Sequence, residues 1–222
     1  MLSDNIINAK RNIELAGGHN VTIVAATKTI SADVISSLPS HGITIVGENR
    51  VQELLSKYDS VNGVAWHFIG RLQRNKVKYI VDKVEMIHSV DSAALADEIN
   101  KQCAKINKVM PVLIEVNLGG EESKGGVNAG DVMELCDYVN NLEHIELRGI
   151  MSVLPKDAPN EMYASLHDLF AKVKGKYPLA DVLSAGMSGD YEIAVRNGAN
   201  LVRLGSCLFG QRIYQQKEVE VD

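Results

Sequence analysis

The chain has 222 residues, 45% of them hydrophobic, and carries 23 Lys and Arg against 28 Asp and Glu, a formal net charge of −5 with a pI near 5.7. A chain of this length can bury one large core, and a closed barrel of this size commonly forms one domain, so residues 1–222 are expected to be a single domain. The negative charge offers no general attraction for phosphate backbones or anionic lipid, which argues against nucleic acid and membrane partners.

Short apolar runs alternate with longer amphipathic segments along the whole chain. The runs predicted as strands are 21–27, 43–48, 65–70, 85–90, 111–118, 147–153, 181–186 and 201–205. Strands that alternate with helices indicate a parallel sheet, and nearly continuous apolar runs fit a sheet that is covered on both faces.

The segments between these runs have helical spacing and start signals. The predicted helices are 4–15, 31–38, 91–108 with Asp91 as the N-cap, 131–141, 161–174 and a short one after Phe209. Eight strand and helix units in this length favour an α/β fold, a single closed (β/α)₈ or TIM barrel. An open doubly wound sheet has the same local pattern and stays open as the alternative.

The cysteines and the amino terminus indicate where the protein resides. Cys103, Cys136 and Cys207 are odd in number and widely spaced, a pattern that fits neither a disulfide framework nor a CxxC metal pair, so no metal site is predicted. The first 18 residues lack the apolar core of a signal peptide, and no segment approaches the ~20 apolar residues of a membrane span. We expect a cytoplasmic protein with reduced thiols.

Lys28 ends the first predicted strand, VTIVAAT. In a barrel of this kind the carboxyl ends of the strands form the active face. Lys28 is in register with Val24 and Ala26, so it points into the barrel if they do. A lysine removed from water is more often neutral and can attack a carbonyl to form an imine. A single lysine at a strand end more commonly extends into solvent, so Lys28 needs support from elsewhere.

The last two loops, LSAGMSGD and LVRLGSCLFG, supply that support. Many barrels bind phosphate here, through loop amides and the start of a short helix. Gly186 and Gly205 allow close approach of the backbone, and Ser188 and Ser206 add hydroxyl donors. Each residue also suits an ordinary turn or N-cap; their occurrence at both loops is what favours a phosphate site.

Arg203 lies two residues before Gly205, on the same side of its strand as Leu201. We therefore expect it to point inward, which is costly unless a partner accepts its hydrogen bonds. Two kinds of partner are open. One is a carboxylate such as Glu115 or Glu48, and the other is a heteroaromatic nitrogen of a bound ligand.

Long motifs along nearly the whole chain carry a family resemblance: VAATKT, GENRVQE, WHFIGRLQRNK, HSVDS, EVNLGGEESKGG, LRGIMSVLP and LSAGMSGDYEIAVRNGANLVRLGSCLFG. With them the sequence resembles the pyridoxal phosphate homeostasis proteins, historically called proline synthetase co-transcribed proteins. The resemblance implies a barrel like the N-terminal domain of alanine racemase, with pyridoxal 5′-phosphate (PLP) as a Schiff base on Lys28. The other residues implied are Arg203 at the pyridine nitrogen, Ser188, Gly205 and Ser206 at the phosphate, and Asn49, Gly186 and Met187 near the cofactor.

The resemblance also implies a role. Family members are thought to bind, store or hand on PLP, which keeps vitamin B6 and amino-acid pools balanced, with PLP-dependent apoenzymes as possible partners and a monomer or weak dimer as the state. Many members carry an aromatic residue at position 50 and a larger residue at position 185, where this chain has Arg50 and Ala185. Neither change touches the Schiff base or phosphate groups, but Arg50 leaves open an extra anionic contact.

The chemistry of the implied site argues for binding rather than catalysis. Arginine stays protonated, so the ring nitrogen that it faces is left largely unprotonated and the ring is a weaker electron sink. Racemisation needs a second acid–base group; in alanine racemase it comes from a second domain, and only twelve residues follow Gly210 here. The alternatives are a PLP-dependent amino-acid racemase and a cofactor-free aldolase-type lyase, in which Arg203 has no evident task.

Three further features are open to more than one interpretation. His67 and His88, near strand ends, are either bases over the pocket or structural hydrogen-bonding groups. The basic stretch RLQRNKVKYIVDK is a solvated helix face or a contact for a partner or nucleic acid. The loop 117–126, NLGGEESKGG, is a mobile lid over the active face or a plain surface loop.

Overall fold

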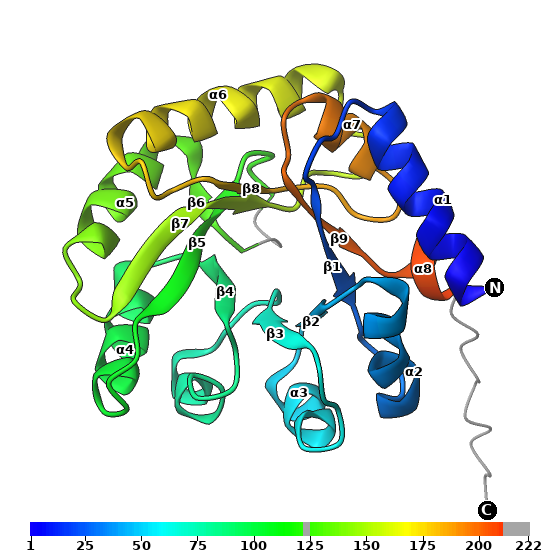
Figure 1. Ribbon diagram of the computed structural model, residues 1–222. Helices are drawn as coiled ribbons and strands as arrows, with labels where there is room; N and C mark the ends of the chain where they lie inside the picture. The colour runs from blue at the N-terminus through cyan, green and yellow to red at the C-terminus, as the bar shows by residue number, and fades with distance from the viewer. Residues whose placement is uncertain (122–124, 211–222) are drawn as a thin grey trace, which may run out of the picture.

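The computed structural model describes residues 1–121 and 125–210, which fold as a barrel of strands inside a ring of helices (Figure 1). Its strands are β1 Thr22–Ala26, β2 Ile45–Glu48, β3 Ala65–Phe68, β4 Met86–Val90, β5 Met110–Asn117, β7 Ile145–Ser152, β8 Val182–Ser184 and β9 Leu201–Leu204. Each overlaps one of the predicted apolar runs. A further strand, β6 Val127–Asn128, extends beside the end of β5 and is too short to give a periodic signal.

The strands close on themselves. Their order is β4-β3-β2-β1-β9-β8-β7-β5, and β4 also pairs with β5. Every pairing is parallel, as between Val24 of β1 and Arg203 of β9. The predicted (β/α)₈ barrel is therefore confirmed, and the open doubly wound sheet is wrong.

The helices surround the barrel, as Figure 1 shows. They are α1 Leu2–Leu15, α2 Ala32–Ser37, α3 Val51–Tyr58, α4 Ala93–Ala104, α5 Val132–Asn140, α6 Asn160–Lys176, α7 Tyr191–Arg196 and α8 Ser206–Phe209, with 3₁₀ turns η1 Leu38–His41, η2 Arg74–Tyr79 and η3 Ala129–Asp131. The helices predicted between residues 4 and 174 are present, and the short one predicted after Phe209 lies outside the described residues. The N-cap assigned to Asp91 is wrong. The cap is Ser92, whose Oγ accepts the N–H of Leu95 at 3.3 Å, because the hydroxyl of Ser92 is the one that reaches the first turn.

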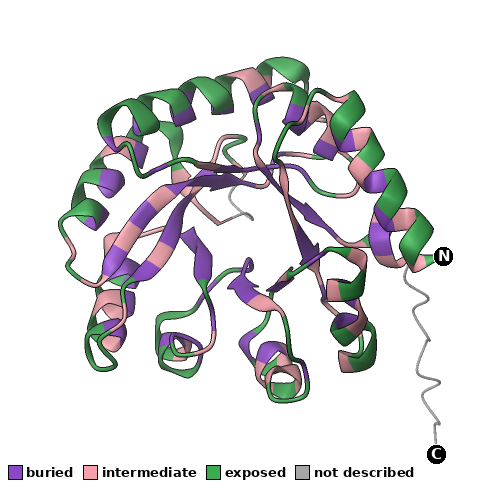
Figure 2. Ribbon diagram, viewed as in Figure 1, coloured by how far each residue is buried: buried purple, intermediate pink, exposed green. Residues whose placement is uncertain are grey.

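The main core lies between the outer face of the barrel and the helices. Figure 2 shows buried residues along the strands and on the sides of the helices that face them. In α6, for example, Leu166, Phe170 and Val173 are buried at helical spacing while the residues between them are mostly exposed. Helix packing of this kind holds the strands in the register that defines the barrel mouth.

The barrel interior is divided into an apolar and a polar layer. Apolar side chains fill part of it in two groups: Val24, Ile69 and Leu201, and Met86, Leu113 and Met151. Two residues further along β4 and β9, the inward positions are His88 and Arg203, both buried. Arg203 therefore points inward, as its register with Leu201 predicts, and the inward polar groups lie toward the carboxyl ends of the strands.

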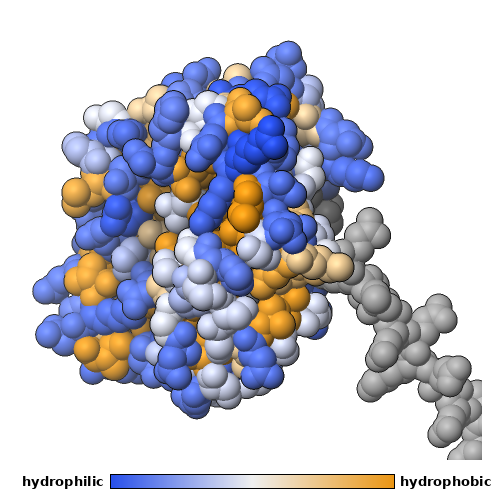
Figure 3. All heavy atoms as spheres, turned by 45° about the vertical axis from the view of Figure 1, so that its right-hand side comes forward, coloured by the Kyte–Doolittle hydropathy of each residue, from blue (hydrophilic) through white to orange (hydrophobic). Residues whose placement is uncertain are grey.

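The outer surface is mixed in character. Figure 3 views the face that carries α1, where hydrophilic side chains surround scattered apolar ones. Within the part of the chain that is described, no helix is both long and apolar enough to cross a membrane. All three cysteines are free, and Cys103 and Cys136 are buried.

Candidate functional site

A cavity of about 660 Å³ opens at the carboxyl ends of the strands. It is lined by Ala26, Lys28, Asn49, Ile69, Val153, Met187, Ser188, Gly189, Arg203, Gly205 and Ser206. The structure thus brings together residues from both ends of the chain, and all the predicted site residues except Gly186 are on the wall. Four residues of the wall were not predicted: Ala26, Ile69, Val153 and Gly189. The first three lie at strand ends, two residues from other inward positions, and this spacing is a weak indication that they also point inward.

Lys28 lies on the cavity wall because the alternation of β1 continues past the end of the strand. Thr27 is fully buried on the outer side of the barrel, where its Oγ1 donates to Glu48 Oε1 at 2.8 Å. The next side chain, Lys28, therefore turns to the inner side. It is only partly buried, so the removal from water expected from the sequence is incomplete.

Asn49 reaches the wall because β3 approaches it closely. A Cβ on Gly70 would lie 2.3 Å from Asn49 O, so only glycine permits this contact. The Ile69 N–H donates to Glu48 O at 2.9 Å and extends the pairing of β2 and β3 to this level. Arg50, in contrast, is exposed at the start of α3 and does not line the cavity.

Arg203 is held by neutral acceptors. Its Nη1 donates to Ser184 O at 2.9 Å and to Ser184 Oγ at 2.5 Å, and its Nη2 donates to Ser152 O at 2.9 Å. Neither Glu115 nor Glu48, the carboxylates considered from the sequence, accepts a hydrogen bond from it: Glu48 lies on the outer side of the barrel, and Glu115 acts on Arg203 only through its charge.

The three bonds above use three of the five N–H groups of Arg203, and the groups that remain are one on Nη2 and the one on Nε. Burial lowers the pKa of Arg203 to about 10, opposed by the charges of Asp190 and Glu115, so the guanidinium is protonated at neutral pH. Among the described residues, none accepts a hydrogen bond from Nε of Arg203. Since Arg203 lines the cavity, this N–H is available to a ligand.

Two histidines extend the hydrogen-bonded network beneath Arg203. His88 Nδ1 lies 3.3 Å from Ser184 Oγ, and His88 Nε2 lies 2.9 Å from His67 Nδ1. Ser184 Oγ accepts from Arg203 and also contacts His88, so Arg203, Ser184, His88 and His67 form one connected chain of polar groups.

Both histidines are neutral at pH 7. Burial lowers the pKa of His67 to about 4. Burial, with smaller contributions from His67 and Arg203, holds the pKa of His88 well below its usual value. Neither ring lines the cavity, so the structure favours the hydrogen-bonded interpretation over bases above the pocket.

The loops after β8 and β9 are tied together by Ser188. Its Oγ accepts the N–H groups of Gly205 at 3.1 Å and Cys207 at 3.2 Å, and its hydroxyl also interacts with the Cys207 thiol. Gly186 shapes this loop without lining the cavity. Its φ is +92°, a Cβ there would lie 2.7 Å from Tyr191 Cα, and its carbonyl accepts the Arg203 N–H at 3.0 Å.

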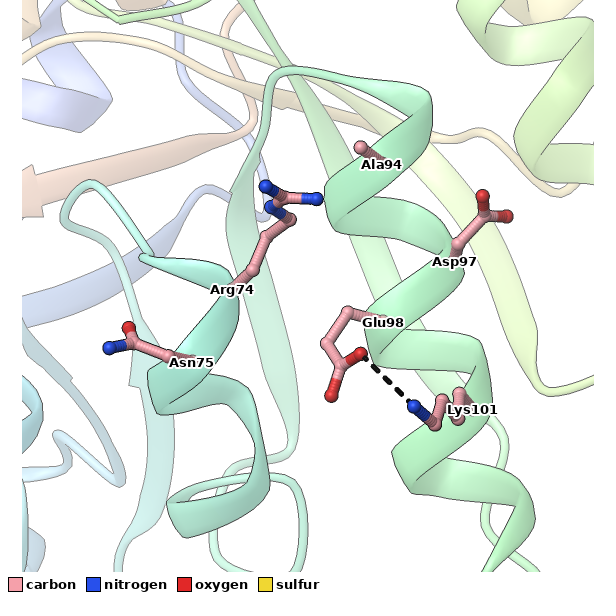
Figure 4. A pocket seen from close by; sticks show the side chains of 6 residues that line it. All are labelled: Arg74, Asn75, Ala94, Asp97, Glu98 and Lys101. Atoms are coloured by element: carbon pink, nitrogen blue, oxygen red, sulfur yellow. Dashed lines mark ion pairs between the residues drawn. The ribbon is translucent and has the colours of Figure 1, made fainter.

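Outside the barrel mouth, the basic stretch predicted as a helix face forms η2, a 3₁₀ rather than an α-helix. A hollow of about 640 Å³ lies between η2 and α4, lined by Arg74, Asn75, Ala94, Asp97, Glu98 and Lys101 (Figure 4). Both signs of charge are present, and Lys101 pairs with Glu98 at 3.9 Å. Of the loop 117–126, residues 122–124 lie outside the described residues, so the choice between lid and surface loop stays a prediction.

Comparisons with known proteins identify the family. The model for the alanine racemase, N-terminal domain, matches residues 3–213. A pyridoxal phosphate homeostasis protein of Aquifex aeolicus is 43% identical over 222 residues, covering 96% of this chain and 97% of the relative. The chain belongs to the pyridoxal phosphate homeostasis protein family. The family member of Escherichia coli strain K12 is 34% identical over 209 residues, which cover 89% and 88% of the two chains.

Solved structures agree with this membership. PipY of Synechococcus elongatus without PLP superposes with a TM-score of 0.86 at 27% identity, covering 95% of this chain and all of PipY. PipY with PLP bound gives 0.84 at 26% identity. An alanine racemase of Clostridium difficile 630 gives 0.74 at 17% identity and covers 96% of this chain but 58% of the racemase, which indicates a shared fold alone.

Proposed function

We propose that this chain binds PLP in the barrel-mouth cavity, attached as a Schiff base to Lys28, and acts in intracellular vitamin B6 and amino-acid homeostasis. The observation that carries the proposal is the sharing of one cavity by the amine of Lys28, the free N–H of Arg203 and the hydroxyl of Ser188. The names of the relatives and the PLP-bound structure of PipY support it.

The amine end and the ring end of the cavity suit this cofactor. Lys28 supplies the only amine on the described wall, and an aldehyde is the group with which an amine condenses. When bound, PLP supplies an electron sink through its ring. Arg203 donates and does not accept, so it would leave the ring nitrogen unprotonated and weaken that sink.

The opposite end suits a phosphate. Ser188 lies on the wall, Ser206 is exposed at the start of α8, and Gly205 lines the wall between them. A Cβ on Gly205 would meet only Ala26, at 3.5 Å from its oxygen, so the neighbouring protein atoms do not require glycine here. A glycine here would also let a ligand approach the backbone. Asn49 and Met187 complete the wall.

We further propose that the chain is a binding protein and not an enzyme. Racemisation needs acid–base groups on both faces of the substrate carbon, and on the described wall only Lys28 and Arg203 are titratable. His67 and His88 are engaged below the cavity. The relatives are named homeostasis proteins, a name that states no reaction. PLP-dependent apoenzymes in the cytosol, where Cys207 would stay reduced, are the proposed recipients.

A visible absorbance spectrum tests the binding proposal. The purified protein incubated with PLP should be yellow, borohydride should shift the absorbance band, and peptide mapping should find the adduct on Lys28. Lys28→Ala should abolish the band, while Lys78→Ala, a change of an exposed lysine on η2, should leave it intact. A protein that stays colourless with excess PLP would overturn the proposal.

Two further measurements separate the alternatives. Exchange of the α-proton of amino acids in heavy water, lost in Lys28→Ala, would replace the binding role with a racemase-type activity. A borohydride-trapped adduct between Lys28 and a phosphorylated sugar, in protein stripped of PLP, would favour the lyase. We expect neither across a broad panel of substrates.

A further inference from the structure

Two charged residues contact the backbone on either side of Lys28, and a third, Glu48, bonds to one of them and to the Thr27 hydroxyl. Lys57 of α3 donates from Nζ to Thr27 O at 2.9 Å, to Glu48 Oε1 at 2.8 Å and to Glu53 Oε1 at 2.7 Å. The Thr29 N–H donates to the same oxygen of Glu53. We call Glu48, Glu53 and Lys57 the α3 clamp. Its hydrogen bonds reach the residue before Lys28 and the residue after it.

Thr29 needs such a partner because its backbone is unusual. Its φ is +68°, in the left-handed region that a β-branched residue rarely occupies. The turn is closed on one side by the Ile30 N–H, which donates to Thr27 O at 2.9 Å. A second donor of the turn, the Thr29 N–H, is fixed by Glu53. This conformation is what brings the chain back from the cavity directly after Lys28.

The α3 clamp lies behind the sheet and not in the cavity. Glu48 and Thr27 are fully buried on the outer side of the barrel, against α3. None of Glu48, Glu53 and Lys57 lines the cavity on which Lys28 lies. The clamp can therefore influence a ligand only by fixing the backbone that carries Lys28.

The charges of the clamp depend on one another. Burial raises the pKa of Glu48, opposed by the hydrogen bonds from Lys57 and Thr27, and Glu48 Oε2 is buried without a hydrogen-bond partner. Burial also acts to raise the pKa of Glu53, but the hydrogen bonds from Lys57 and the Thr29 N–H lower it overall, so Glu53 is an ionised acceptor at neutral pH. Within residues 1–121 and 125–210, Lys57 is the one cation that bonds to both carboxylates.

We propose that Glu53 and Lys57 are positioning residues for Lys28: they hold Thr27 and Thr29 so that the intervening amine points into the cavity. The inference rests on the proposed role of Lys28 in PLP binding. It assigns this task to two residues of α3 that do not line the cavity themselves.

Glu53→Ala tests the clamp against a matched control. Glu134→Ala changes an exposed glutamate at the same third position of α5. In protein without PLP, the amide of Thr29 should exchange with heavy water at least about tenfold faster in Glu53→Ala than in the control. Affinity for PLP, followed by the visible band, should fall by about tenfold or more, because small misplacements of a reacting group are costly. Glu53→Gln, whose amide oxygen still accepts the Thr29 N–H, should restore most of the slow exchange at Thr29 and most of the affinity for PLP.

The outcomes separate this inference from the proposed function. If the unaltered protein fails to bind PLP, the proposed function fails, and amide exchange alone decides on the clamp. If PLP binds at Lys28 but Glu53→Ala matches Glu134→Ala in both exchange and affinity, the clamp has no positioning role and the inference is wrong.

A second variant covers the case in which Glu53→Ala does not fold. Glu48→Gln with Lys57→Met removes both members of the buried ion pair together, so no unpaired buried charge remains. We expect this protein to fold and to bind PLP at least about tenfold more weakly, because the bond to Thr27 O is lost. Unchanged affinity in this folded double variant would overturn the role of Lys57.

Discussion

Lys28 and Arg203 line the same cavity, but the groups that hold them differ in charge and in location. The backbone around Lys28 is held from outside the barrel by the α3 clamp, in which Glu48 and Lys57 form a buried ion pair. Arg203 is held from inside the barrel by neutral groups, two carbonyls and the hydroxyl of Ser184. The backbone at the Lys28 end is held by a pair of opposite charges. The side chain at the Arg203 end is a single charge held by neutral hydrogen-bond acceptors.

This difference has a physical consequence. An ion pair between buried groups fails when one partner is removed, because the other charge is left unpaired in a poorly solvated place. A charge held by neutral acceptors fails when an acceptor is lost or when a neutral neighbour becomes charged. The two ends of the cavity should therefore respond to different perturbations, and four measurements separate them.

Removal of the cation from the α3 clamp should have the largest effect. Lys57→Met leaves Glu48, which is fully buried, without its ion-pair partner, and should lower the free energy of unfolding by about 3 kcal/mol or more. Urea unfolding measures the change. Glu48→Gln with Lys57→Met should recover most of the loss, and equal stabilities of the single and double variants would contradict a charge-dependent clamp.

Acid should act at the Arg203 end, through the histidines beneath it. The pKa of His67 is about 4 in the folded protein and about 6.5 in the unfolded chain, so between these values only the unfolded chain binds the proton. The free energy of unfolding should therefore fall as the pH falls through this window, by about 2 kcal/mol at pH 5 from His67 alone. His67→Gln should remove this part of the pH dependence in urea unfolding, while His19→Gln, at an exposed position, should not.

Two glycine variants should separate an effect on stability from an effect on PLP affinity at the Arg203 end of the cavity. Gly186→Ala places a Cβ 2.7 Å from Tyr191 Cα in a left-handed backbone, and should cost roughly 1–3 kcal/mol. Gly205→Ala meets its nearest protein atom at 3.5 Å and has a negative φ, so it should change stability little but weaken PLP binding. Thermal unfolding and titration of the visible band measure the two effects; a Gly205→Ala protein with full affinity would remove Gly205 from the proposed phosphate site.

Salt should have the smallest effect and should reach only the Lys28 end. At 1 M salt the screening length is ~3 Å, and Glu53 and Lys57 are partly exposed. We expect amide exchange at Thr29 to quicken by an amount equivalent to less than about 1 kcal/mol. The amide of Arg203, whose side chain is bonded to neutral groups, serves as the internal reference. An equal response at both amides would show that the two ends of the cavity do not differ in their dependence on charge.

Local pattern was enough to predict which residues point into the barrel. Strand alternation depends only on backbone geometry, so Lys28 and Arg203 were placed inward from the apolar residues in register with them. The apolar runs likewise predicted each of the eight barrel strands, and the loops after β8 and β9 were predicted as part of one site. Helix ends were less certain, because neighbouring polar residues such as Asp91 and Ser92 compete for the same cap.

What holds the inward residues was decided by the tertiary structure. From the sequence, carboxylates were considered as partners of Arg203, whereas the closed barrel places Ser152 and Ser184 against it. Nor could the sequence pair His67 with His88, or Lys57 with the backbone beside Lys28. Alternation reports the side of a strand to which a side chain points, which is a local property. The group that lies opposite depends on strand order, register and closure, which arise only when distant segments pack together.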